Sequence, residues 1–180
     1  IATRFLREGM KVIGLARDHS KFVPSEDIYH PITVDLTDIT KLEQTTHSIL
    51  TQYPEISVFI SNAGYGNFRN IENFSTPQIE EFFNVNLISQ VILCRHMISH
   101  FKGNGSGDVI IMGSEAALAG KRKATLYSAA KFGLRGFAQA LRDEVAASGV
   151  RVCMINPGLV RSPFFDSLDF EPGNLTNNAI

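Results

Sequence analysis

Short apolar runs alternate with longer segments of helical periodicity along most of the chain. The runs that we expect to form buried strands cover residues 11–16, 31–35, 56–61, 108–112 and 150–155. Amphipathic helices are expected over residues 1–8, 39–52, 76–101 and 126–147. Continuously apolar strands that alternate with helices are typical of a parallel sheet covered on both faces. The pattern therefore predicts the α/β class, with a doubly wound parallel sheet and helices on both faces in a single domain over residues 1–180.

Polar and glycine residues mark where some of these elements begin and end. Thr76 is expected to cap the third helix, because Pro77 behind it suits the first helical position. The segment Gly103-Asn104-Gly105-Ser106-Gly107 superficially suggests a phosphate loop. It follows a helix and precedes a strand, which is the reverse of the order that directs amide groups at a phosphate. We expect it to be a turn.

Composition narrows the classes of function. The 180 residues include 17 Lys+Arg and 18 Asp+Glu, so the near-neutral balance predicts neither a nucleic-acid partner nor a polybasic membrane anchor. A hydrophobic fraction of 44% is globular, yet no window approaches the roughly 18 unbroken apolar residues of a membrane span. Cys94 and Cys153 lie far apart in apolar runs. They are expected to be reduced core thiols, which favours a cytoplasmic location.

The strongest chemical signal joins a serine, a tyrosine and a lysine. Tyr127 and Lys131 are four positions apart on an expected helix and so share a face, and Ser114 follows a buried strand. A nearby ammonium group favours the phenolate and moves a tyrosine pKa toward neutral pH. Ser114 lies where open α/β sheets form their ligand crevice, so its hydroxyl could orient a carbonyl oxygen. Taken singly, a surface tyrosine and a solvated lysine would explain the pair equally well.

These three residues belong to a longer series of motifs. In order along the chain, the series is Asn62-Ala63-Gly64, Val85-Asn86, Ser114, Tyr127, Lys131 and Asn156-Pro157-Gly158. With this set, the sequence resembles the short-chain dehydrogenase/reductase family, from Ile1 to about Phe165. The resemblance implies a Rossmann-like fold and hydride transfer between a nicotinamide cofactor and a carbonyl or alcohol.

The resemblance also implies a role for each catalytic residue. Tyr127 would be the general acid in reduction and the general base in oxidation. Lys131 would lower the tyrosine pKa and hold the nicotinamide ribose, and Ser114 would hydrogen-bond the substrate oxygen. Asn86 would join a proton relay through a water, although an amide at a helix kink is an alternative that can coexist with this role.

Several other residues would contact the cofactor by the same resemblance. Asn62, Ala63 and Gly64 would line its channel, and Asp35 would meet the adenine edge unless it is merely a surface carboxylate. The loop that would hold the nicotinamide carboxamide includes Pro157, Gly158, Val160 and Ser162. The family more often has threonine in place of Ser162, and a second serine in place of Gly113.

The choice of cofactor is argued from the end of the strand 11–16. NAD-preferring relatives carry an acidic residue where this chain has Ala16, so no carboxylate repels a 2′-phosphate. Arg17 could bind that phosphate with two hydrogen bonds, although it could also pair with Asp18. We therefore expect NADP(H).

Three other signals are weaker. His96 and His100 are one helical turn apart, but no third zinc ligand is apparent, so no metal site is expected. Lys121-Arg122-Lys123 is expected to be a solvated surface, with attraction of an anionic substrate or acidic carrier protein as the alternative. Phe164, Phe165, Leu168 and Phe170 are expected to form an apolar lid over the substrate, with packing of the phenylalanines on a neighbouring subunit as the alternative.

The resemblance carries two expectations about the whole protein. The chain is expected to be part of a longer polypeptide, without the first strand, its glycine-rich loop and the C-terminal elements of the family. The first strand would lie between the strands that end at Ala16 and Ser61. A homodimer or homotetramer is expected by resemblance alone. The rival hypotheses are a non-catalytic NADP(H)-sensing protein and an interaction protein of the same fold.

Overall fold

The computed structural model describes residues 1–22, 24 and 27–160. Its strands are β1 (Val12–Ala16), β2 (Tyr29–Thr33), β3 (Val58–Ser61), β4 (Gly107–Met112) and β5 (Val150–Ile155). The main helices are α1 (Ala2–Arg7), α2 (Ile39–Gln52), α3 (Thr76–Phe83), α4 (Ser89–Asn104) and α5 (Thr125–Val145). The shorter helical segments are η1 (Ile71–Asn73), η2 (Asn84–Ile88) and η3 (Glu115–Ala117). No helix in the described part of the chain is both long and apolar enough to cross a membrane.

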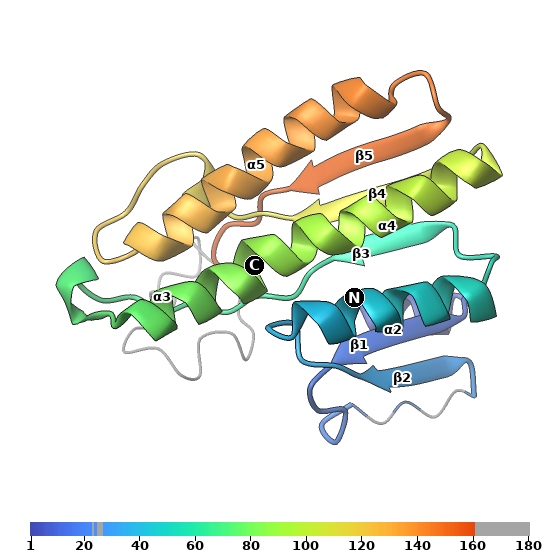
Figure 1. The fold of residues 1–180 in the computed structure, drawn as a ribbon, viewed down its shortest axis with the longest axis horizontal. Helices are drawn as coiled ribbons and strands as arrows, with labels where there is room; N and C mark the ends of the chain where they lie inside the picture. Colours follow the sequence, from blue (N-terminus) through green and yellow to red (C-terminus); the bar gives the residue numbers. More distant parts are fainter. Residues whose placement is uncertain (23, 25–26, 161–180) are drawn as a thin grey trace.

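All the strand pairs are parallel, as expected for this fold class. β1 pairs with β2, and β3, β4 and β5 form a second sheet in that order. The five strands follow one another side by side and point the same way, with the open edges of β1 and β3 facing each other (Figure 1). Pro31 lies in β2, which pairs with β1 and no other described strand, and an edge strand tolerates a residue that has no N–H group.

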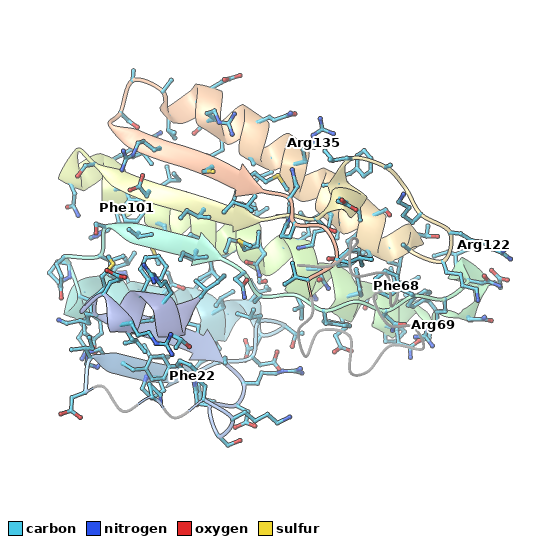
Figure 2. All side chains as sticks on the ribbon, turned by 180° about the vertical axis from the view of Figure 1, so that it is seen from behind. Phe22, Phe68, Arg69, Phe101, Arg122 and Arg135 are labelled. Carbon is cyan, nitrogen blue, oxygen red and sulfur yellow. The ribbon has the colours of Figure 1, made fainter. Side chains whose placement is uncertain are left out.

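Helices lie on both faces of the strands (Figure 1). α2, α4 and α5 cover one face, and α1 lies against β1 on the other (Figures 1 and 2). The largest apolar core lies between α4, α5 and the second sheet, and it contains Phe101, Val109 and Leu134. The doubly wound arrangement predicted from the sequence is thus confirmed.

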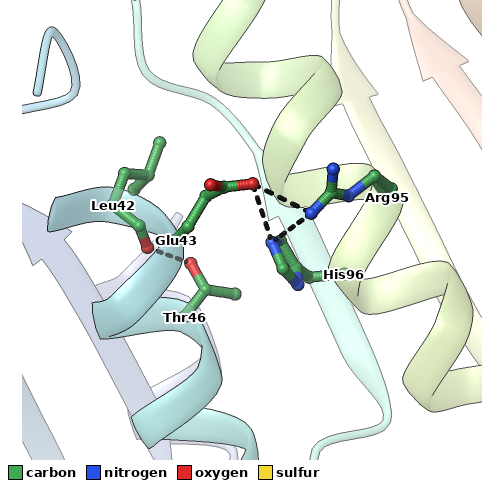
Figure 3. Close-up of polar contacts among 5 residues, drawn as sticks. All are labelled: Leu42, Glu43, Thr46, Arg95 and His96. Atoms are coloured by element: carbon green, nitrogen blue, oxygen red, sulfur yellow. Dashed lines mark hydrogen bonds and ion pairs between the residues drawn. The ribbon is translucent and has the colours of Figure 1, made fainter. Parts of the chain in front are cut away.

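Polar contacts fasten α2 to α4 at the protein surface (Figure 3). The Glu43 carboxylate accepts a 2.9 Å hydrogen bond from Arg95 and lies 3.7 Å from the His96 ring. Within α2, the buried Thr46 hydroxyl donates to the Leu42 carbonyl at 2.7 Å. His96 therefore faces a carboxylate on the neighbouring helix.

The expected long helix over 76–101 is present, and the π-helical turn η2 lies within it between α3 and α4. The cap is one residue earlier than expected. Ser75 and Gln78 form a capping box, in which the Ser75 N–H donates to the Gln78 side chain at 3.0 Å. Thr76 and Pro77 are the first two helical residues.

Two further expectations were wrong. The second strand begins at Tyr29 rather than Pro31, because the ladder with β1 starts early and the Tyr29 hydroxyl is bound to His19 at 2.9 Å. Cys94 is buried, but Cys153 is exposed. Residues alternate between buried and exposed along most of β5, since α5 packs against one of its faces, and Cys153 falls on the other face.

Candidate active site

Ser114 lies just beyond the carboxyl end of β4, where three hydrogen bonds fix the chain. Its N–H donates to the Asn156 side chain at 3.2 Å, and its hydroxyl caps η3 by accepting from the Ala116 N–H at 3.1 Å. The next N–H, of Glu115, donates to the Pro157 carbonyl at 3.0 Å. The serine is therefore tied to the loop after β5. This loop carries the Asn156-Pro157-Gly158 motif.

Gly113 makes the contact between Ser114 and Asn156 possible. A side chain at position 113 would overlap the Asn156 amide oxygen, which accepts the Ser114 N–H. The glycine at a position where the family resemblance leads us to expect a second serine thus has a local structural reason. Sequence reasoning quoted Asn156 as part of a motif but assigned it no contact.

Tyr127 and Lys131 lie in the first two turns of α5, on the face that meets Ser114. Tyr127 is 9% exposed and hydrogen-bonded to the Ser114 side chain. The Lys131 ammonium group is 5.7 Å from the centroid of the tyrosine ring and donates a 2.9 Å hydrogen bond to the Met112 carbonyl. The structure therefore brings the three expected catalytic residues together.

Burial changes the proton affinity of both helix residues. It raises the pKa of Tyr127, and the hydrogen bond with Ser114 opposes this rise only in part. It lowers the pKa of Lys131 from 10.5 to about 8. The net direction for Tyr127 is opposite to the one expected from the sequence, because loss of water disfavours the phenolate. Each group is thus pushed toward its neutral form.

Asn86 holds the backbone of the expected cofactor segment. It is 1% exposed within η2, its amide group donates to the Phe82 carbonyl at 3.0 Å, and its oxygen accepts from the Tyr65 N–H at 3.0 Å. A Cβ on Gly64 would lie 2.7 Å from that oxygen, so a glycine fits there. The contact connects the helix interruption to the segment that begins at Asn62. The expectation of a helix-kink amide agrees with this geometry.

Two buried residues near Asn86 were missed by sequence reasoning. The Ser61 hydroxyl, at the end of β3, donates to the Gln90 side chain at 2.5 Å. Gln90 in turn donates to the Val85 carbonyl at 3.1 Å, inside the π-helical turn. Polar residues at positions 89 and 90, within an otherwise apolar helix face, were the available signal.

The expected adenosine-side residues line one cavity of about 770 Å³. Its walls include β1, β3 and the expected cofactor residues Arg17, Asp35, Asn62, Ala63 and Gly64. The cavity extends into the space between the open edges of β1 and β3. The structure thus gathers these five residues around one opening, although Tyr127 and Lys131 are not part of its wall.

Arg17 is exposed and makes no ion pair with a described residue. The expected alternative, pairing with Asp18, is not the arrangement found, because Asp18 accepts from the Ser20 N–H and hydroxyl at 2.8 and 2.9 Å. Asp35 accepts from the Thr37 N–H and hydroxyl at 2.9 and 2.8 Å. These bonds lower the pKa of Asp35, and the charge of Arg17 contributes to the same effect.

The expected carboxamide loop is described only as far as Val160. Pro157 is close to η3 through its bond with Glu115, and a Cβ on Gly158 would lie 3.1 Å from the Glu115 carboxylate. Val160 is 42% exposed. Ser162 and the expected lid residues lie outside the described residues.

The family assignment follows from a direct match. A family model for short chain dehydrogenases matches residues 1–171, so the chain belongs to this family. Its sequence is 30% identical over 168 residues to a 3-oxoacyl-(acyl-carrier-protein) reductase of Buchnera aphidicola, covering 93% of this chain and 65% of that protein. It is 29% identical over 163 residues to a 3-alpha-(or 20-beta)-hydroxysteroid dehydrogenase of Mycobacterium bovis, covering 88% of this chain and 63% of that protein.

Solved structures agree on the fold. A short-chain dehydrogenase from Streptomyces avermitilis matches with a TM-score of 0.82 and 26% identity, over 87% of this chain and 60% of that one. A protein from Beutenbergia cavernae, described as an NAD(P)-dependent gluconate 5-dehydrogenase with bound NADP, matches with a TM-score of 0.87 and 25% identity. That match covers 93% of this chain and 70% of the other. The chain spans somewhat less than two thirds of the length of each of the two relatives compared by sequence, the reductase and the hydroxysteroid dehydrogenase.

Proposed function

We propose that the protein is an oxidoreductase that transfers a hydride between NADP(H) and a carbonyl or alcohol substrate. The observation that carries the proposal is the joint placement of Ser114, Tyr127 and Lys131 at the carboxyl end of β4, with Tyr127 hydrogen-bonded to Ser114. A surface tyrosine with a solvated lysine would not have this burial.

The residues of the chain would manage the substrate oxygen and its proton. The Ser114 hydroxyl orients and polarises the oxygen, and Tyr127 donates its proton in reduction or accepts one in oxidation. Burial raises the pKa of Tyr127, so the residue is protonated at neutral pH, which is the form that donates in reduction. Lys131 supplies the charge that stabilises the phenolate after the proton has left, and a relay through Asn86 would restore the proton.

The residues at the end of the cavity that adjoins the carboxyl ends of β1 and β3 fit the adenosine part of a dinucleotide. Ala63 and Gly64 are small residues, which would let the adenosine ribose approach the backbone. Arg17 offers a guanidinium group without a carboxylate partner among the described residues. NADP(H), when bound, would donate or accept the hydride. Asn62 and Asp35 would bind its adenosine part, while Lys131 would hold the nicotinamide ribose. Pro157, Gly158, Val160 and Ser162 would hold the carboxamide.

The cofactor preference has a direct test. Arg17 would bind the 2′-phosphate, so the wild-type protein should have a lower KM for NADPH than for NADH. Arg17→Ala should raise the KM for NADPH and leave that for NADH nearly unchanged. Exposed Arg122 offers a matched control, because it lies in the loop before α5 rather than on the cavity wall (Figure 2). A lower KM for NADH in the wild type would reject the preference.

We also propose that a further parallel strand fills the space between β1 and β3. Among the described residues, nothing pairs with the facing edges of β1 and β3, which border a largely apolar cavity, and a strand between them would join the two sheets. Intact-mass measurement of the natural protein, followed by sequencing of its ends, tests whether one polypeptide supplies that strand. The homodimer or homotetramer and the cytoplasmic location remain predictions, and light scattering tests the former.

The activity itself is tested by NADPH consumption with a panel of aldehydes, ketones and quinones. Turnover of at least one carbonyl class supports the oxidoreductase. Tight binding of NADPH without turnover of any panel member would favour the sensing protein.

A further inference from the structure

We propose that Glu81 is a further specificity-determining residue for the cofactor, because its carboxylate lines a small polar cavity beside the place where Arg17 would bind the 2′-phosphate. The inference rests on the proposed function, in which Arg17 is the residue that favours NADP(H). The negative charge of Glu81 repels the 2′-phosphate and has little effect on a ribose that lacks it. The protein therefore discriminates less sharply between NADP(H) and NAD(H) than Arg17 alone would make it do.

The first support is the cavity that Glu81 shares with Arg17. The cavity has a volume of about 250 Å³, and the residues that line it are all polar: Arg17, Tyr65, Asn67, Gln78 and Glu81. Arg17 and Tyr65 also line the larger cavity that the expected adenosine-side residues surround. The two cavities therefore adjoin at Arg17 and Tyr65. A phosphate that Arg17 binds from the larger cavity lies next to the wall that carries Glu81.

The second support is that Glu81 is held on this wall by a fixed helix. The capping box fixes the first turn of α3, where the Ser75 N–H donates to the Gln78 side chain at 3.0 Å. Gln78 and Glu81 are three positions apart, so they share one face of the helix. The next residue, Phe82, is buried and anchors α3 in an apolar cluster. α3 lies at the end of the molecule toward which β1 and β3 point (Figure 1).

The third support is the charge on the two residues. Among the residues that the structure describes, neither Glu81 nor Arg17 takes part in an ion pair, so neither charge is neutralised by a close partner. The hydroxyl of Tyr65 lies within the electrostatic reach of both. Burial raises the pKa of Tyr65, the charge of Glu81 raises it further, and the charge of Arg17 lowers it. A phosphate at Arg17 is therefore within reach of the Glu81 charge.

The test measures binding rather than turnover, by calorimetric titration of the natural protein with 2′,5′-ADP and with 5′-AMP, which differ only in the 2′-phosphate. The quantity of interest is the Kd for 5′-AMP divided by the Kd for 2′,5′-ADP. Glu81→Gln should raise this ratio by roughly two- to fivefold, the size of effect that exposed charges have on one another. Glu81→Lys should raise it further. Glu80→Gln is the matched control, because Glu80 is an exposed carboxylate of the same helix that does not line the cavity, and it should leave the ratio unchanged.

Salt separates an effect of charge from an effect of structure. Salt screens exposed charges, so the difference between Glu81→Gln and the wild type should shrink as NaCl is raised from about 0.05 M to about 0.5 M. A difference of the same size at both concentrations would overturn the role of the charge.

The outcomes also separate this inference from the proposed function. If Arg17→Ala lowers the ratio but Glu81→Gln leaves it unchanged or lowers it, the role of Glu81 is overturned and the preference for NADP(H) stands. If Arg17→Ala leaves the ratio unchanged, Arg17 does not bind the 2′-phosphate and the role of Glu81 fails with it. If the wild type binds neither nucleotide, the proposed cofactor site fails as well.

Discussion

Lys131 and Tyr127 form a buried pair in which the ammonium nitrogen lies 5.7 Å from the tyrosine ring centroid. The lysine is 5% exposed, and it donates to the carbonyl of Met112 at the end of β4. Desolvation acts on the two groups in opposite directions: it raises the pKa of the tyrosine and lowers that of the lysine. Several measurable properties follow from this pair and from the bonds around it.

The stability of the protein should depend on pH through Lys131. Its folded pKa is depressed from 10.5 to about 8, so between these values the unfolded chain binds more protons than the folded one. The free energy of unfolding contributed by this residue therefore rises as pH increases from about 8 toward 10.5, by up to about 3 kcal/mol. Urea unfolding across this range measures the effect: the unfolding free energy of the wild type should rise with pH relative to that of Lys131→Met. The exposed Lys41→Met should show no such trend, and a flat difference for Lys131→Met would contradict the burial.

The rate of carbonyl reduction should also depend on the charge of Lys131. By the proposed mechanism, reduction needs protonated Tyr127 and charged Lys131. Burial lowers the pKa of Lys131 to about 8, so the lysine loses its charge as pH rises through that value. We expect kcat/KM for reduction to be level below that pH and to fall about tenfold per pH unit well above it. A profile that rises through the same range would exclude a charged lysine from the mechanism.

Loss of the Asn86 side chain should loosen the segment that begins at Asn62. Asn86→Ala leaves the Tyr65 N–H without its partner, which should cost about 1–3 kcal/mol of unfolding free energy. It should also raise the KM for NADPH, because the expected cofactor segment is no longer held. Asn84→Ala is the matched control, two positions earlier in η2, and should cost less than about 1 kcal/mol. Equal effects of the two substitutions would show that the Asn86 side chain does not hold this segment.

A side chain at position 113 should disturb the candidate active site through Asn156. Gly113→Ala would push aside the amide that accepts the Ser114 N–H, with an expected cost of about 1–3 kcal/mol and a lower kcat. In Gly136→Ala, the new Cβ meets no atom within 4 Å, and the helix propensity of alanine should stabilise the protein by about 1 kcal/mol. Thermal unfolding and steady-state rates compare the two. Unchanged kcat in Gly113→Ala would mean that the Asn156 bond does not position Ser114.

The sequence predicted what depends on local spacing. The helix over Ile39–Gln52 has the expected bounds, and the shared face of Tyr127 and Lys131 follows from their separation on one helix. Ser114 lies after its strand as the order of motifs indicated.

Contacts between distant segments were beyond the sequence. The rings of Phe68 and Tyr127 meet because the segment before α3 packs against the apolar cluster at the start of α5. The exposure of Cys153 depends on which face of β5 is covered, and an apolar run contains no such information. The raised pKa of Tyr127 arises from its burial in the folded protein, within an apolar cluster that includes Phe82 and Leu126, whereas spacing on the helix revealed only its charged neighbour.

The most direct test of the central claim is the NADPH-dependent turnover of Tyr127→Phe beside that of the wild type. The substitution removes the hydroxyl that is bonded to Ser114 but keeps the ring that packs against Phe68. We predict that kcat falls by at least about 10²-fold, while NADPH affinity, measured by fluorescence titration, stays within a factor of about two. Turnover of the variant close to the wild-type rate would contradict the account.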